Sequence, residues 1–384
     1  MSRQWRTAAC VGLALVSVAA QRAFALPTMI RLGYPNCASC HISPQGGGLL
    51  NPYGRGIDRA QSLQGGEYVP LDAEWSRLLN WNGRITQDIR TVLQQQDVST
   101  TGRPGTQLFR GRFLYRNATE FGRGFRLTLT LTGENTGAPR LPLTYDPPSK
   151  PAAAFVNTAL LSYRAKPGLE FAIGRDQLPT GVNVADLAVF TRSRNRLGYY
   201  DAPTQAKLFW WGKRYMVIPY VYAPGGNEQT GRHESGGGAL GEVDLFGKQR
   251  TVAGFNFLHG SAASGDRTMF GPYVRLGFGK WGFLAEHDIT NRKVTVPSTA
   301  DFTQSATYGQ LFWAVREWLV PSLIAERLRV DTPFREQLAA VKLELAARLT
   351  PQLTLSAGPR IQKDSITGRV SKSVVFQVAI KTAR

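Results

Sequence analysis

The stretch Arg123–Gly133, RGFRLTLTLTG, alternates between two kinds of side chain. Positions 125, 127, 129 and 131 carry Phe and three Leu, whereas positions 126, 128, 130 and 132 carry Arg and three Thr. Because successive side chains of a β-strand point to opposite faces, this stretch predicts a strand with one apolar and one polar face. A strand of about ten residues is long enough to cross a bilayer. The core of a soluble β-sandwich would also explain the apolar face.

The same alternation recurs along the chain after residue 80. In QLFRGRFLYRN, which begins at residue 107, Phe, Gly, Phe and Tyr share one face, and Arg, Arg, Leu and Arg share the other. An even number of such segments is typical of bacterial outer-membrane barrels. Sixteen segments are predicted to be strands: 82–92, 107–119, 123–133, 154–165, 168–176, 204–213, 214–223, 239–247, 250–260, 268–278, 281–290, 303–316, 321–331, 336–349, 352–362 and 371–381.

The connections between these segments alternate in length. Short links such as KP and GKW take turns with long ones at 134–153, 177–203, 224–238 and 291–302. Short periplasmic turns and long outer loops produce this alternation in membrane barrels, whereas a soluble sandwich or solenoid does not require it. No run of about 18 apolar residues follows residue 25, which excludes helical membrane spans. We therefore expect an all-β fold, a transmembrane up-and-down barrel of about 16 antiparallel strands.

The chain is strongly basic, with a formal net charge of +19. Such a charge indicates an anionic partner or an anionic lipid surface, and nucleic acid is not expected for an exported protein. A basic lumen would favour anions, although the charges could simply solvate a wet interior. The segment 191–196, TRSRNR, could constrict the lumen or meet anionic lipid outside. The basic residues expected in the lumen are Arg110, Arg112, Arg116, Arg126, Arg164, Lys207, Lys342 and Arg348.

The first 25 residues are expected to be a secretory signal peptide. Arg3 and Arg6 precede an apolar stretch, and Ala23-Phe24-Ala25 has the form of a cleavage site. Beyond it we expect a small N-terminal segment at 26–75 and the barrel at 76–384. An exported chain lies in an oxidising compartment, but two cysteines after residue 25 are too few for a disulfide scaffold.

Those two cysteines form the motif Cys37-Ala-Ser-Cys40-His41. The C-x-x-C-H spacing is that of c-type haem attachment, where two thiols form thioethers with one porphyrin and the histidine is an axial iron ligand. One covalent haem c is therefore expected at Cys37, Cys40 and His41. A zinc site would need about four ligands, a thioredoxin-like redox pair would need a βαβ unit, and a plain disulfide would not need His41.

Further residues could surround the haem, although each could equally belong to an ordinary Gly/Pro loop. Arg55 or Arg59 could pair with a haem propionate. The sixth iron ligand stays open between none, Met29 and a downstream histidine, His233, His259 or His287. The residues expected to pack around the haem are Pro44, Gly46, Gly47, Gly48, Leu49, Leu50, Pro52 and Tyr53.

This layout resembles the fused monohaem cytochrome–porins of the outer membrane, known from iron-oxidising bacteria. The resemblance covers the architecture of the whole chain, and the individual residues Cys37, Cys40 and His41. It implies electron transfer across the outer membrane to or from a periplasmic carrier, a cytochrome or copper protein, rather than an enzyme. Whether the chain is also a terminal oxidase or reductase of an extracellular substrate stays open. A basic lumen should repel Fe²⁺, so the donor is also left open. The alternative is an anion-permeable porin with a periplasmic haem segment that serves as plug, sensor or docking site.

Overall fold

The computed structural model describes residues 27–34, 36–64, 85–100, 103–135, 152–182, 184, 189–197, 202–225, 233–248, 250–295, 300–333 and 335–381. The expected signal peptide, residues 65–84 and most of the long connection at 134–153 lie outside these ranges. Among the described residues, no helix is long and apolar enough to cross a membrane.

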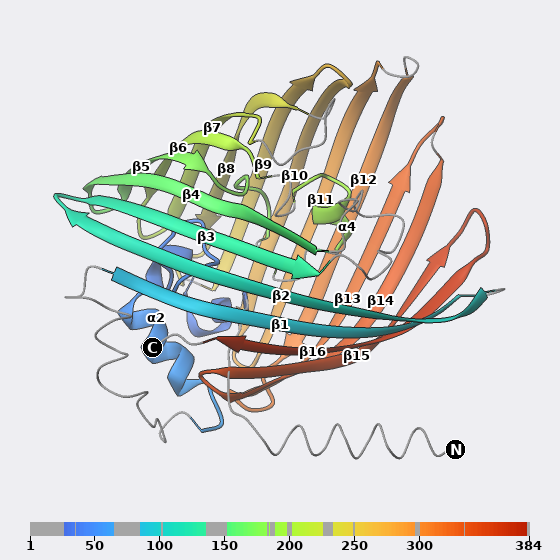
Figure 1. Ribbon diagram of the computed structural model, residues 1–384, viewed down its shortest axis with the longest axis horizontal. Coiled ribbons are helices and arrows are strands. Elements are labelled where there is room, and N and C mark those ends of the chain that lie inside the picture. The colour runs from blue at the N-terminus through green and yellow to red at the C-terminus, as the bar shows by residue number, and fades with distance from the viewer. Residues whose placement is uncertain are drawn as a thin grey trace.

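Sixteen antiparallel strands form one closed barrel in chain order, sealed by the pairing of β1 with β16 (Figure 1). Each of the sixteen predicted segments overlaps one strand, in the predicted order, which confirms the up-and-down barrel. The strands are β1 (Ile85–Thr100), β2 (Arg103–Gly122), β3 (Phe125–Asn135), β4 (Ala152–Lys166), β5 (Leu169–Arg175), β6 (Thr204–Trp211), β7 (Tyr215–Ala223), β8 (Ser235–Asp244), β9 (Thr251–Ala262), β10 (Gly265–Phe278), β11 (Trp281–Val294), β12 (Ala300–Trp313), β13 (Leu319–Val330), β14 (Glu336–Thr350), β15 (Leu353–Asp364) and β16 (Val370–Lys381).

The two faces of β3 show which side of the sheet faces the lumen. Arg126 and Thr132 are buried inside the barrel, whereas Leu127 and Leu131 are 38% and 40% exposed on the outside. A sandwich would bury the apolar face and expose the polar one. The reversed arrangement is that of a barrel whose outer wall faces lipid.

Aromatic side chains gather on the outer wall near the short turns. Trp210 and Tyr215 pack edge to face at 5.3 Å, and Trp281 and Trp313 stack at 5.3 Å. Such girdles mark the membrane–water boundary of barrels. Trp211, next to Trp210 in the sequence, does not join this girdle. Because neighbouring side chains alternate, Trp211 turns toward the lumen and packs on the buried core.

The basic lumen side chains are held in ion pairs. Arg116 donates from Nε to Asp88 Oδ1 at 2.6 Å, and Lys207 Nζ lies 2.5 Å from Asp176 Oδ2. The expected basic lumen is therefore a network of paired charges. Of the eight residues predicted there, Arg110 is the one whose side chain is not described. The remaining pairs of that set are Arg112–Glu134, Arg126–Glu170, Arg164–Glu170, Lys342–Glu344 and Arg348–Asp58.

Glu170 offers a test of this network because it is 1% exposed and accepts from both Arg126 and Arg164. Glu170→Gln should lower the free energy of unfolding by about 3 kcal/mol, mainly because the buried Arg126 guanidinium loses its counter-charge, whereas the Arg164 side chain is 46% exposed and contributes less. Urea unfolding in lipid vesicles measures the change. Asp331→Asn is the control, because its pair with Arg329 is half exposed and should contribute under about 1 kcal/mol. Equal losses in the two variants would contradict the prediction.

Candidate functional site

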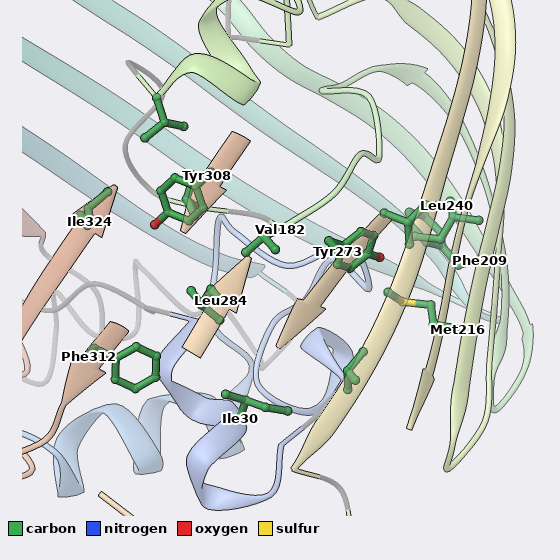
Figure 2. Close-up of a cluster of buried hydrophobic side chains, with 14 of the residues drawn as sticks. Ile30, Val182, Phe209, Met216, Leu240, Tyr273, Leu284, Tyr308, Phe312 and Ile324 are labelled. Carbon is green, nitrogen blue, oxygen red and sulfur yellow. The ribbon is translucent and has the colours of Figure 1, made fainter. Parts of the chain in front are cut away.

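The N-terminal segment lies inside one end of the barrel. The 3₁₀ helix η1 (Pro27–Leu32) packs against β10 and β11. Ile30 is 1% exposed and belongs to a lumen cluster with Leu284 and Phe312 (Figure 2). Gly277 of β10 makes room for this helix, because a Cβ there would lie 2.5 Å from Arg31 Cα. The segment therefore enters the barrel by its short-turn end.

One ion pair, one side-chain hydrogen bond and two backbone hydrogen bonds fix the segment to that end. Arg31 pairs with Glu317 in the short turn between β12 and β13. The helix α2 (Pro52–Ala60) is followed by Gln61, which accepts a hydrogen bond from Arg348 Nη1 at 2.9 Å. The amides of residues 63 and 64 donate to the last carbonyls of β14, each at 3.0 Å. In Figure 1, α2 accordingly lies beside the barrel mouth.

The cysteine motif forms a single helical turn, η2 (Cys37–Ser39). Asn36 Oδ1 accepts from Ala38 N at 2.9 Å, and His41 N donates to Cys37 O at 2.9 Å. Cys37 and Cys40 lie three residues apart in this turn, and the two thiols are close enough that, besides burial, Cys37 raises the pKa of Cys40. His41 follows directly and forms an isolated β-bridge with Leu50.

Cys37 and Cys40 are both free thiols in the structure. Among the residues that the structure describes, no group of three His, Cys, Asp or Glu side chains is placed to hold a metal ion. The described part of the segment, 27–64, consists of short helical turns rather than a βαβ unit.

Asn51 and Gly54 hold α2 against the motif, and sequence reasoning missed both. Asn51 Nδ2 donates to Ser39 O at 3.1 Å, its amide donates to Cys40 O at 2.9 Å, and its Oδ1 accepts from Gly54 N at 2.8 Å. A Cβ on Gly54 would lie 2.1 Å from Cys40 O, so only glycine allows this approach. The sequence signal was the N-cap pair Asn51-Pro52 ahead of a helix.

Cys37 lies against the lumen wall. Its thiol is hydrogen-bonded to the guanidinium of Arg275, which pairs with Glu242 at 2.5 Å. Glu242 also accepts from Tyr273 Oη at 2.9 Å. Burial raises the pKa of both Cys37 and Cys40, and at Cys37 the Arg275 charge opposes this shift. The motif therefore faces a polar group of the barrel that sequence spacing could not connect to it.

The loop after the motif carries the glycines expected to pack a haem. Gly46, Gly47 and Gly48 have φ values of 84°, 72° and 62°, a backbone region that other residues rarely adopt. No atom lies within 4 Å of a Cβ built on Gly48, so the loop leaves open space there. Pro44 is buried, and Gln45 Oε1 accepts from Lys207 Nζ at 2.9 Å, which ties the loop to β6.

Tyr53 lies at the surface of the mouth rather than inside it. It is 53% exposed and meets Tyr34 edge to face, with ring centres 5.9 Å apart and a hydrogen bond between the hydroxyls. That bond raises the pKa of Tyr34 to about 12. Of the two arginines expected near propionates, Arg55 donates to Leu50 O at 3.3 Å and Arg59 is exposed.

The three downstream histidines are excluded as sixth ligands. His259 and His287 lie on the outer wall, where their rings bond Thr268 and Thr307, because their neighbours in the strands face the lumen. His233 is exposed ahead of β8. Of the candidates named from sequence, only Met29, within η1, belongs to the same segment as the motif.

The long connection after β5 folds into the lumen. Its short helix α4 (Phe190–Ser193) presents Phe190 N to Glu326 Oε2 at 2.8 Å, and Arg192 pairs with Glu286 at 3.3 Å. Asn195 Nδ2 donates to Asp288 Oδ2 at 2.9 Å. This answers the question left open for 191–196, because the segment constricts the lumen rather than lying on the outside (Figure 1).

The rest of the lumen has a packed side and a polar side. On β6 to β12, inward side chains such as Phe209, Leu284 and Phe312 are buried (Figure 2). On β15, β16 and β1, several inward side chains are small or polar and half buried: Gln94, Ser356, Gly358, Ser373 and Gln377. Nearer the short-turn end, inward side chains of the same strands, Asp88, Thr354 and Ala379, are buried. The half-buried polar side of the wall therefore lies beyond these buried residues, toward the long-loop end.

No family model and no curated protein matches the sequence. Solved structures do match the fold. The chain is similar to an anion-selective porin from Comamonas acidovorans (TM-score 0.55, 11% identity, 78% of this chain and 100% of that chain). It is also similar to OprB of Pseudomonas putida at high pH (0.60, 9%, 81% and 97%) and to a loop-deletion mutant of OmpT of Vibrio cholerae (0.56, 10%, 77% and 99%). The chain thus has the fold of outer-membrane porins.

Proposed function

We propose that the chain is an electron-transfer protein of the outer membrane, in which one covalent haem c is held at the short-turn mouth of a porin-like barrel. The observation that carries the proposal is the place of the cysteine motif. Cys37 touches the lumen wall at Arg275, and the preceding helix is packed among lumen side chains at Ile30. The motif therefore contacts the inner wall of the barrel rather than lying outside it.

The residues around the motif fit the proposed group. Cys37 and Cys40 supply the two thioether sulfurs, and His41 supplies an axial nitrogen from the same turn. A haem bound there supplies one-electron redox chemistry. Arg275 places a cation beside Cys37, and Asn51 keeps α2 against the turn. The glycines at 46–48 allow close approach of a flat ligand.

The half-buried polar side of the lumen supports an approach from outside. A small donor or acceptor could follow the inward residues of β15, β16 and β1 from the long-loop end as far as the buried side chains of Asp88, Thr354 and Ala379. The same wall supports the second candidate, an anion-permeable porin with a haem-bearing plug. One neighbour in fold is an anion-selective porin. Against strong anion selectivity in this chain stand the paired lumen cations, such as Arg116 with Asp88.

Liposomes separate the two candidates. Purified protein, reconstituted with an entrapped redox dye, should reduce or oxidise that dye when a donor or acceptor is added outside. Cys37→Ala/Cys40→Ala should bring electron transfer to background while leaving ion leakage through the barrel unchanged, because neither residue belongs to a strand. If the haem-loaded wild type leaks ions but transfers no electrons, the electron-transfer proposal is overturned and the anion-permeable porin remains.

A further inference from the structure

Exposed basic side chains surround the short-turn end of the barrel. In the connections β2–β3, β6–β7, β8–β9, β10–β11 and β12–β13, and at the end of β4, every charged residue that the structure describes is basic except Glu317. Glu317 forms an ion pair with Arg31. Because consecutive short turns of a closed barrel follow one another around its rim, these side chains form an arc from β2 to β13, here named the basic ring, whereas the β14–β15 turn, Pro351 and Gln352, carries no charge. This basic ring consists of Arg123, Lys166, Lys213, Arg214, Lys248, Arg250, Lys280 and Arg316, all exposed.

In the basic ring, unlike elsewhere in the described chain, the basic side chains greatly outnumber nearby carboxylates. In the lumen, basic side chains are held against carboxylates, as with Arg126 and Glu170. At the long-loop end, described acids and bases are mixed: Arg329 pairs with Asp331 at 3.0 Å, and Lys363 is followed by Asp364. At the short-turn rim, the exposed acids described are Glu317, already paired, and Glu120 at the end of β2.

The ring lies at the same end of the barrel as the N-terminal segment. Arg59 and Tyr53 of α2 are exposed at the mouth, Tyr53 by 53%. The helix packs on the cysteine motif, since Gly54 of α2 contacts Cys40. An incoming protein at this mouth would therefore meet the Tyr53 side chain and the cations of the rim, on a helix that lies against the motif.

We propose that the basic ring and the exposed face of α2 form the docking surface for a small, soluble, acidic electron carrier. The inference deepens the proposed function and rests on it, since it names the partner that would exchange electrons at this mouth. A ring of like charges around a low-dielectric opening focuses its field along the axis, and this raises the rate of encounter with an oppositely charged protein. Such steering suits a transient redox complex, which needs fast exchange and little buried area.

Anionic lipid headgroups have the same charge as the proposed carrier. They lie outside the barrel wall, however, whereas Arg59 and Tyr53 belong to α2, which is fixed at the mouth through the bond between Gln61 and Arg348. The protein partner is the one occupant that meets both the ring and α2. Lipid binding is an outcome that the test must separate.

The test is Lys213→Glu/Lys248→Glu/Lys280→Glu in the full chain, held in nanodiscs of zwitterionic lipid. These three lysines are exposed and lie in turns, so folding should survive, and heat-modified gel mobility checks it. The probe is a small acidic c-type cytochrome, with a basic cytochrome as the charge control. The matched variant is Lys293→Glu/Arg335→Glu/Lys363→Glu, which makes the same charge change at the long-loop end.

The association rate of the acidic cytochrome with wild type should fall steeply with added salt, and the turn variant should lower it about tenfold or more at low salt. The long-loop variant should stay within about twofold, because its charges lie beyond the Debye length from the mouth. Equal rates for wild type and turn variant would overturn the docking surface. So would a turn variant that loses only its binding to anionic-lipid vesicles.

The haem-free variant Cys37→Ala/Cys40→Ala keeps the two proposals apart. It should bind the acidic cytochrome as wild type does, because the ring does not involve either cysteine. If the wild type binds the acidic cytochrome but carries no haem, the electron-transfer function is refuted and the docking surface still stands. Electron transfer across liposomes with no dependence on the ring would refute the docking surface alone.

Discussion

Haem should remain on the wild-type chain through a denaturing gel and should be absent from Cys37→Ala/Cys40→Ala. A thioether survives denaturation, whereas an axial bond from His41 does not hold haem on an unfolded chain. The two thiols lie three residues apart in a single turn, so each single variant should retain one thioether and a weaker haem stain. Peroxidase staining of the gel, with expression alongside a haem-attachment system, measures the result.

Ser39→Ala is the matched control for these variants. It changes a side chain in the same turn, while the Ser39 contact with Asn51 uses the backbone carbonyl and is retained. Its haem stain should equal that of the wild type. Covalent haem on the double variant, or none on a correctly folded wild type, would refute the haem assignment and return the motif to a structural or redox role.

Gly54→Val should detach α2 from the cysteine turn. The new Cβ would lie 2.1 Å from Cys40 O, and the backbone on both sides must shift to relieve the contact. Overpacking of this kind costs about 1–3 kcal/mol, which is a large share of the stability of so small a segment. We expect a several-fold lower ratio of haem to protein and faster protease cleavage within 27–64, while the barrel itself stays folded.

Gly56→Val on the same helix provides the comparison, because no atom lies within 4 Å of a Cβ at that position. It should leave haem content and protease resistance close to those of the wild type. If the two substitutions have the same effect, helix propensity rather than the contact with Cys40 determines the stability of the segment, and the prediction fails.

The strands could be predicted from sequence because their signal is local. In β3 the Leu and Thr positions alone indicate which side faces lipid. The signal weakens where a strand is made of small residues. β8 begins at Ser235, ahead of the predicted 239, and includes three glycines that a sequence pattern assigns to a turn. They fit a strand because the Tyr220 hydroxyl lies across Gly238, where a Cβ would be 2.6 Å from it.

The charge pairing could not be predicted, because it depends on which strands become neighbours. Arg126 meets Glu170 only because β3, β4 and β5 lie side by side. The motif itself was evident from its spacing. The residues that hold the motif in place could not be predicted in this way. Arg275 contacts Cys37 from β10, far away in the sequence. Gly54 matters because it has no side chain.

The burial of Ile30 also sets an order of events during biogenesis. Its cluster draws on strands from β4 to β13, ending with Ile324. The ribosome releases Ile30 before any of these strands, so the residue stays without its partners until nearly the whole chain has been made. Contacts so distant in sequence form slowly. A haem attached to the neighbouring turn during that interval would be enclosed when the strands assemble around it. The N-terminal segment would then be among the last parts of the chain to be buried.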